Sequence, residues 1–185
     1  MSEEQKHSIG HLLGVSGFVA VFALVLLFGR SIASSGQDPA ASDSRFAANA
    51  AAGGMAEVKL GQLAQQRAAS NAVKAFGKRM VEDHSRSGEQ LRETAKGESI
   101  RLPEQMNARD QAAYDRLSKL SGAQFDRTYM QMMVKDHEED VAEFKREASS
   151  GKNKALKDFA EQTLPTLEDH LKEAREVAGN RKTST

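Results

Sequence analysis

The sequence of 185 residues contains no cysteine and no tryptophan, and only three prolines. Without cysteine the chain can form no disulfide bond and no thiolate metal site, and cysteine-based catalysis is excluded. Basic and acidic residues balance at 26 each, so no excess of charge favours a nucleic-acid partner. No Ser-His-Asp pattern, phosphate-binding loop or general acid–base pair is visible, which argues against an enzyme. The residues that abound, such as Ala, Glu, Lys and Leu, are those that favour helices.

One long apolar run lies near the N-terminus. No residue from Ile9 to Phe28 is charged, and about twenty helical residues span about 30 Å, the thickness of the hydrocarbon core of a bilayer. We predict a transmembrane anchor over 9–29, after a short tail at 1–8. A signal peptide cleaved near Ser31 is the main alternative. A buried core helix fits less well, because the run has no polar face.

The same segment predicts where the protein is found. Because a single span precedes a large domain, we expect that domain to be exported, which places the protein in a bacterial inner membrane with its C-terminal domain in the periplasm. After signal cleavage the domain would instead be free in the periplasm. The Ser/Ala/Gly-rich residues 30–43, interrupted by Pro39, predict a flexible linker. The membrane is then one partner, and an envelope protein or a second copy of the chain is another candidate.

Residues 44–179 show four helical patterns, each of about 25 residues and so about 38 Å long. The patterns cover residues 44–69, 71–96, 122–151 and 153–179. Short connections make the first two an antiparallel hairpin, and likewise the last two. The segment 97–122, with a short helix at 109–120, is long enough to cross the height of a bundle. Two hairpins joined by one crossover predict an all-α, ferritin-like four-helix bundle, followed by a disordered tail at 180–185.

Apolar residues repeat at helical spacing in the last three patterns and are expected to form the core. They are Val73, Phe76, Met80, Leu91 and Ala95; then Phe125, Met130, Met133, Val141 and Phe144; then Leu156, Phe159, Leu164, Leu167, Leu171 and Val177. Met132 extends a methionine group that we interpret as core filling rather than as a cofactor site.

Four polar residues interrupt the apolar faces, one on each helix: Glu57, His84, His137 and His170. At 100° per residue each side chain points inward, and each lies near the middle of its helix, so the four are expected to meet at one level. Imidazole and carboxylate groups ligate Zn, Fe and Mn, which predicts a metal site inside the bundle. The alternative is that each histidine is an ordinary core residue hydrogen-bonded to a neighbour.

Further acidic residues accompany the histidines. Asp140 and Glu173 each follow a histidine by three residues, which suits an additional or supporting ligand. The aspartates that directly precede the histidines, Asp83 among them, lie about 100° away and mark the edge of the polar face. Val81, which stands three residues before its histidine, and its two counterparts are apolar, so the carboxylates of a di-iron site are missing. We therefore predict a mononuclear site, or none, rather than ferroxidase chemistry.

Four segments, Gly53–Gly61, Phe76–His84, Leu120–Tyr129 and Leu164–Leu171, resemble in order the motifs of the bacterial domain-of-unknown-function family 4142. The resemblance covers residues 44 to 178. It implies a ferritin-like domain of the cell envelope, since members are described as membrane or outer membrane proteins, but it supplies no function.

Three residues of these motifs carry separate expectations. Asp126 lies near the start of its helix, where it serves the helix dipole or caps a neighbouring element. Tyr129 is expected to be a core residue with a hydrogen-bonded hydroxyl group. Pro165 lies within its helix and predicts a kink one turn before His170.

Two functions from different classes follow from these observations. The first is an envelope protein that binds a metal ion, with a role in metal buffering or oxidative stress. The second is a helical module without metal that binds another envelope component or itself. A metal titration distinguishes them.

Overall fold

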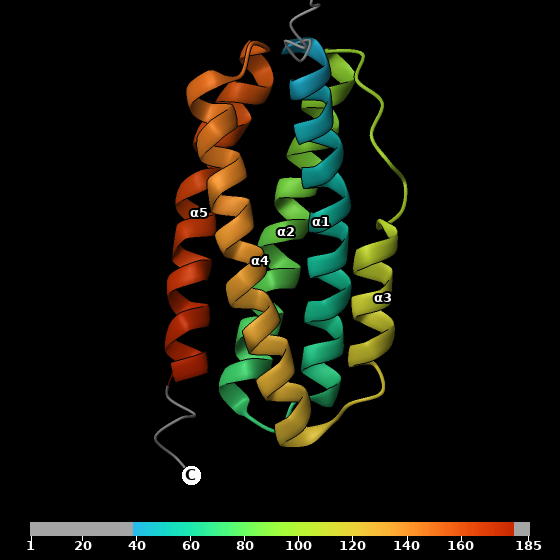
Figure 1. Ribbon diagram of the computed structural model, residues 1–185, viewed down its shortest axis with the longest axis vertical. Coiled ribbons are helices and arrows are strands. Elements are labelled where there is room, and N and C mark those ends of the chain that lie inside the picture. Colours follow the sequence, from blue (N-terminus) through green and yellow to red (C-terminus); the bar gives the residue numbers. More distant parts are fainter. Residues whose placement is uncertain (1–38, 180–185) are drawn as a thin grey trace, which may run out of the picture. The chain divides into compact units, whose positions relative to one another are not determined.

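The computed structural model describes residues 39–179, which fold into five helices (Figure 1). These are α1 (Pro39–Arg67), α2 (Asn71–Gly97), α3 (Ala108–Leu117), α4 (Gly122–Ser150) and α5 (Lys154–Gly179). The predicted anchor at 9–29, the tails at 1–8 and 180–185, and the first part of the predicted linker lie outside the described residues. Within the described part of the chain, no helix is long and apolar enough to cross a membrane.

Four of the helices form a bundle in which every neighbouring pair is antiparallel. Helices α1 and α2 form one hairpin and α4 and α5 the other, while α2 packs on α5 and α1 packs on α4 (Figure 1). After α2 the chain returns along the outside of the bundle, and α3 packs there against α1 and α4. This is the arrangement of two hairpins and one crossover that the connection lengths predicted.

Two predicted boundaries were wrong. Helix α1 begins at Pro39 rather than at Ser44, so the end of the predicted linker 30–43 is helical. Proline is compatible with a first helical turn, because its fixed φ suits the helix and its missing N–H would have no intrahelical partner there. The crossover helix ends at Leu117 rather than at residue 120. It begins after Asn107, whose side chain accepts a hydrogen bond from the backbone N–H of Asp110 at 2.9 Å.

The core consists of two apolar clusters, one on each side of a polar layer. The first cluster includes Leu60, Val73, Phe76, Met80, Phe125, Tyr129, Met130 and Met133. The second includes Phe46, Leu91, Val141, Phe144, Leu156, Phe159, Leu167 and Leu171. The predicted core residues are buried, except that Leu164 and Val177 are only partly so, and Met132 also packs against the first cluster. The methionines therefore fill the core, as expected.

Each hairpin turn is held by an aspartate from the other hairpin. Asp126 of α4 accepts hydrogen bonds from the backbone N–H groups of Ala69 and Ser70, both at 3.0 Å. Asp43 of α1 accepts them from Lys152 and Asn153, at 2.9 and 2.5 Å. The expectation that Asp126 caps a neighbouring element is confirmed. A carboxylate bonded to two backbone donors fixes the turn more firmly than a neutral acceptor would.

The two hairpins are equivalent halves of the bundle. The number of residues that separates Asp43 from Asp126 also separates the start of α1 from the start of α4. It likewise separates the start of α2 from the start of α5. This offset also relates Val73 and Phe76 of one half to Leu156 and Phe159 of the other, all of them buried. Positions related by this offset are called equivalent below.

Two glycines bring α1 and α2 into close contact. A Cβ atom on Gly61 would lie 2.5 Å from the carbonyl oxygen of Gly77, and one on Gly77 would lie 2.8 Å from the carbonyl oxygen of Gly61. No side chain can occupy either position without moving a helix, so this hairpin depends on both glycines.

Tyr129 differs from its prediction. Its hydroxyl oxygen is buried and has no hydrogen-bond partner among residues 39–179. The ring stacks on Phe125 at a centroid distance of 5.5 Å and meets the edge of Phe76 at 6.2 Å. The apolar surroundings that bury the ring therefore offer its hydroxyl group no acceptor. Helix α5 runs through Pro165 without interruption, and the kink there remains a prediction.

Candidate metal centre

The polar layer between the two apolar clusters is formed by the four residues that the sequence placed at one level. Glu57 comes from α1, His84 from α2, His137 from α4 and His170 from α5. His137 and His170 have no exposed surface, Glu57 is 2% exposed and His84 is 8% exposed. The structure thus brings together all four predicted residues, at the middle of the bundle and away from solvent.

Short distances join the four side chains. Glu57 Oε2 lies 2.8 Å from His84 Nδ1, and Glu57 Oε1 lies 3.4 Å from His137 Nε2. His137 Nε2 is in turn 3.4 Å from His170 Nδ1. The potential ligand nitrogens of the three histidines all lie within 4.8 Å of one another. The three imidazoles are therefore close enough together to be candidate ligands of one ion.

The outward-facing atoms of the imidazoles determine where their protons are. His137 Nδ1 lies 2.9 Å from the carbonyl oxygen of Met133, and His170 Nε2 lies 2.9 Å from Asp83 Oδ2. Because these oxygens only accept hydrogen bonds, each of the two nitrogens carries the N–H. In a neutral imidazole the other nitrogen then carries a lone pair, which assigns lone pairs to His137 Nε2 and His170 Nδ1.

His84 follows the same pattern. Its Nδ1 donates to Glu57 Oε2, which leaves the lone pair on Nε2. That Nε2 atom is buried and has no hydrogen-bond partner among the described residues, and the same holds for Glu57 Oε1. Each imidazole is therefore held through one nitrogen and presents a bare nitrogen at the other.

When Glu57 is ionised, these bare atoms face one another without a proton between them. His137 Nε2, His170 Nδ1 and Glu57 Oε1 are all acceptors, and two of their separations are 3.4 Å. A tetrahedral ion with ligand bonds of about 2.0–2.1 Å holds its ligand atoms about 3.3–3.4 Å apart. Metal-bound histidines also donate their second N–H to a carboxylate or a carbonyl group, as these do. The arrangement with an ionised Glu57 therefore suits a cation, which supplies the positive charge that a hydrogen-bond network lacks here.

The protonation states of the four side chains also suit a metal-binding site. Burial lowers the pKa of His84, His137 and His170 to about 4, so all three imidazoles are neutral at pH 7, the form that binds metals. Burial raises the pKa of Glu57 to about 7, an effect that His137 opposes and Asp110 reinforces. A bound cation would favour the ionised carboxylate and pull this pKa down.

The supporting residues are only partly those predicted. Asp83, interpreted from the sequence as the edge of the polar face, instead holds His170 on another helix. Glu173, predicted as a supporting ligand, does not reach the centre but pairs with Arg79 at 2.6 Å. Arg79 also bonds Asp83 at 3.3 Å, so Glu173 is connected to His170 only through two other side chains. The sequence did not predict this contact, because the angle between Asp83 and His84 around α2 does not show which residue of α5 lies next to Asp83.

The other acidic positions have different surroundings. Asp140 lines a cavity beside Glu57 and His84, and burial together with the Glu57 carboxylate raises its pKa. Asp136 is also largely enclosed, and its pKa is raised to about 7 by burial and by Glu57. Asp169 is exposed. The aspartate of the repeated Asp-His pair thus has different surroundings at each of its three occurrences.

Comparisons with known proteins extend the picture of the fold. A DUF305 fragment from Deinococcus radiodurans superposes with a TM-score of 0.66 at 14% identity, over 75% of this chain and 96% of that one. A DUF305 protein from Streptomyces coelicolor, described as a candidate secreted protein, superposes with a TM-score of 0.63 at 15% identity, over 76% of this chain and 94% of that one. At these identities the similarity establishes the fold alone.

No curated protein matches the sequence. The family model described as "Domain of unknown function (DUF4142)" matches residues 30–177. The match confirms the resemblance seen in the four motifs, and the chain belongs to the DUF4142 family.

Proposed function

We propose that this protein binds one transition-metal ion inside its helical bundle, through His84, His137, His170 and Glu57. The observation that carries the proposal is the meeting of lone pairs from two imidazoles and a carboxylate, 3.4 Å apart and buried, with their other polar atoms tied to neighbouring groups. Without a cation, and with Glu57 ionised, these acceptors repel one another in a medium of low dielectric constant. A bound ion removes that repulsion and satisfies all of them.

The donor set limits the choice of metal. Three imidazole nitrogens and one carboxylate oxygen suit Zn, Fe or Mn, whereas Mg and Ca favour oxygen ligands. Val81, Val134 and Leu167 stand where a di-iron bundle of ferritin-like type carries its Glu-x-x-His carboxylates. This favours one ion, and a protein that binds or buffers metal rather than a ferroxidase, on a bundle of ferritin-like connectivity.

The proposed location is the cell envelope. Residues 9–28 carry no charge and are long enough to span a bilayer, which supports an anchor in a bacterial inner membrane with the bundle in the periplasm. A structural neighbour described as a candidate secreted protein is consistent with export. N-terminal sequencing of the protein from membrane and soluble fractions tests both the anchor and the alternative of signal cleavage.

The metal proposal is tested on the full chain, purified in detergent and stripped of metal by a chelator. Calorimetric titration with Zn²⁺, Mn²⁺ or Fe²⁺ is expected to show about one ion per chain for at least one of them. The paired substitution His84→Ala with His137→Ala should abolish this binding, while Asp169→Ala, an exposed member of the same repeat, should preserve it. His7 and His11 are present in every variant, so any binding by them cancels. Equal binding by the double variant would overturn the proposal.

A further inference from the structure

A cavity of about 40 Å³ lies against the proposed metal centre. Glu57, His84 and His170 form part of its wall, and so do Gly54, Ser87 and Leu167. One water molecule requires about 10–15 Å³ measured in this way, so the cavity has room for about three atoms of that size. It therefore reaches three of the four proposed ligands and is too small for an organic substrate.

The equivalence of the two hairpins explains why space exists at this place. Gly54 is equivalent to His137 and Ser87 is equivalent to His170, so one half of the bundle has small residues where the other has imidazoles. The carboxylate Glu57 keeps an acidic equivalent, Asp140, which also lines the cavity. The cavity thus lies beside two of the three places that equivalent imidazoles would fill, while Leu167 stands at the position equivalent to His84. On the side of the cavity the bundle therefore has an acidic group, Asp140, and empty space.

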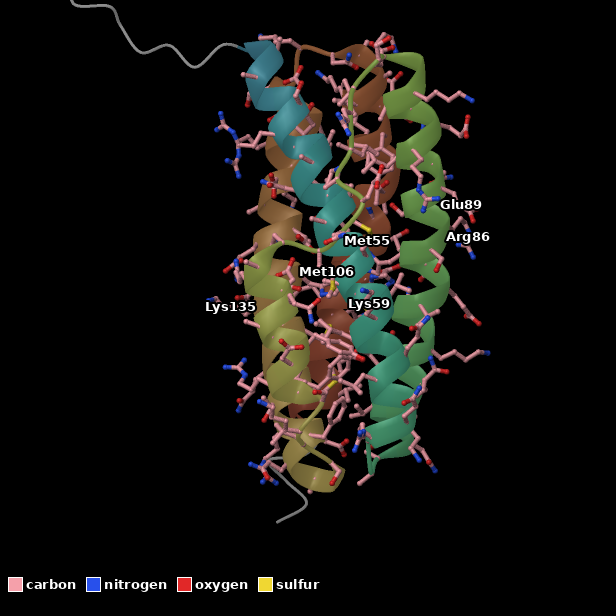
Figure 2. All side chains as sticks on the ribbon, turned by 90° about the vertical axis from the view of Figure 1, so that its right-hand side faces the viewer. Met55, Lys59, Arg86, Glu89, Met106 and Lys135 are labelled. Carbon is pink, nitrogen blue, oxygen red and sulfur yellow. The ribbon has the colours of Figure 1, made fainter. Side chains whose placement is uncertain are left out.

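The cavity shares two wall residues with a larger groove on the outside of the bundle. This groove, of about 850 Å³, lies between α1, α2 and the crossing segment before α3. Figure 2 shows this side of the molecule, with Met55 and Lys59 on α1 and Met106 at the end of the crossing segment. Gly54 and Gly88 line both the groove and the inner cavity. The two glycines therefore stand between the groove and the inner cavity.

Packing does not explain either glycine. A Cβ atom on Gly54 would meet no atom within 4 Å, and one on Gly88 would meet only the end of the Arg92 side chain at 3.7 Å. Both lie inside helices, where glycine is about 1 kcal/mol less favourable than alanine. This contrasts with Gly61, whose position is closed to any side chain by the backbone of α2. The missing side chains at 54 and 88 leave an opening instead of permitting a close contact.

We propose that the cavity is the binding site of a small exogenous ligand of the metal, which arrives from the groove between Gly54 and Gly88. The ligand class is a molecule of two or three non-hydrogen atoms that coordinates transition metals, of the size of dioxygen, hydrogen peroxide or azide. This inference rests on the proposed metal centre and adds an exchangeable coordination position to it. Asp140, Ser87 and Thr166 line the cavity and supply polar groups for such a ligand.

The test uses the full chain in detergent, loaded with Co²⁺ so that the visible absorption of the metal reports its ligands. Azide is the probe, mixed with the protein by stopped flow. In the wild type we expect azide to change the Co²⁺ spectrum. The paired variant Gly54→Val with Gly88→Val should take up azide about tenfold more slowly, because the added side chains would narrow the proposed entrance to the cavity. Gly97→Val, at the end of α2 and outside both cavities, is the matched control.

Each outcome decides one part of the inference. Equal azide rates in the wild type and the paired variant would overturn the route through the glycines. A Co²⁺ spectrum that azide leaves unchanged in the wild type would overturn the ligand site while leaving the metal centre intact. Failure to bind Co²⁺, Zn²⁺, Mn²⁺ and Fe²⁺ would remove both proposals together. If circular dichroism shows that the paired variant does not fold, Gly54→Ala, whose methyl group meets no atom within 4 Å, provides the comparison.

Discussion

Replacing Glu57 by glutamine should have opposite effects on the stability of the metal-free protein and on metal binding. The carboxyl group is 2% exposed, and burial raises its pKa from 4.5 to about 7. In the unfolded chain it ionises near its ordinary value, so between these two pH values the folded state holds a proton that the unfolded state has lost. Stability therefore falls as the pH rises through this range.

The magnitude follows from the size of the shift. A difference of about 2.5 pKa units corresponds to about 3 kcal/mol of lost stability above pH 7 and to about 1 kcal/mol at pH 5. Glutamine does not ionise, and its amide can accept from His84 and donate to His137, which the carboxylate cannot do. The variant should therefore exceed the wild type in stability by an amount that grows by about 2 kcal/mol between pH 5 and pH 8.

The assay is urea denaturation of the chelator-treated proteins at several pH values, with metal titration of the same samples. Metal affinity of Glu57→Gln should fall by at least about tenfold, because a neutral amide is a poorer ligand than a carboxylate. Glu168→Gln is the control, since its side chain is 47% exposed and pairs with Lys145 at the surface. Its stability should change by less than about 0.5 kcal/mol at every pH. A stability difference that is the same at pH 5 and pH 8 would refute the argument, as would unchanged metal affinity.

Three further predictions follow from the same contacts. Asp83→Asn should raise the metal Kd by about tenfold to a hundredfold, because the carboxylate that orients its histidine partner is lost, whereas the exposed Asp169→Asn should leave titrations unchanged. Gly61→Ala should cost about 1–3 kcal/mol in thermal denaturation, since its methyl group would lie 2.5 Å from a backbone oxygen, whereas Gly97→Ala meets no atom and should not destabilise. At pH 6 the histidines are neutral and Glu57 is protonated, so metal binding should release about one more proton from the wild type than from Glu57→Gln. Calorimetry in buffers of different ionisation enthalpy measures this difference.

The convergence of the four site residues could be predicted because it depends only on periodicity and length. A residue near the middle of a long helix meets the middles of its neighbours whichever way each helix runs, and the apolar faces show which way it points. For this reason the convergence of Glu57 and the three histidines could be predicted without knowing the order of the helices in the bundle. The two hairpins and the crossover could be predicted in the same way, from the lengths of the connections between periodic segments.

Contacts that depend on the rotation of one helix against another could not be predicted. Asp83 lies away from His84 on its own helix, yet that direction takes it to His170 on α5. Glu173 is turned toward Arg79 and so away from the centre. The spacing of Glu173 from its histidine suggested a supporting role, but spacing within one helix gives no position relative to a second helix. The hydroxyl group of Tyr129 was mispredicted for a related reason, because the sequence does not show which residues surround a buried ring.

The two halves of the bundle are alike in the contacts that hold their ends together and differ in the polar layer at the centre. Both halves keep the aspartate that holds the opposite turn and the apolar pair that begins the second helix, and these contacts determine the fold. The halves differ in the central layer, where Gly54 and Ser87 occupy the positions equivalent to His137 and His170. Each buried imidazole must be compensated, and a second set would need further partners in a layer already crowded with acceptors. With one set of imidazoles and space beside it, the proposed metal ion would have three nitrogen ligands and an open side for the exchange of a small ligand.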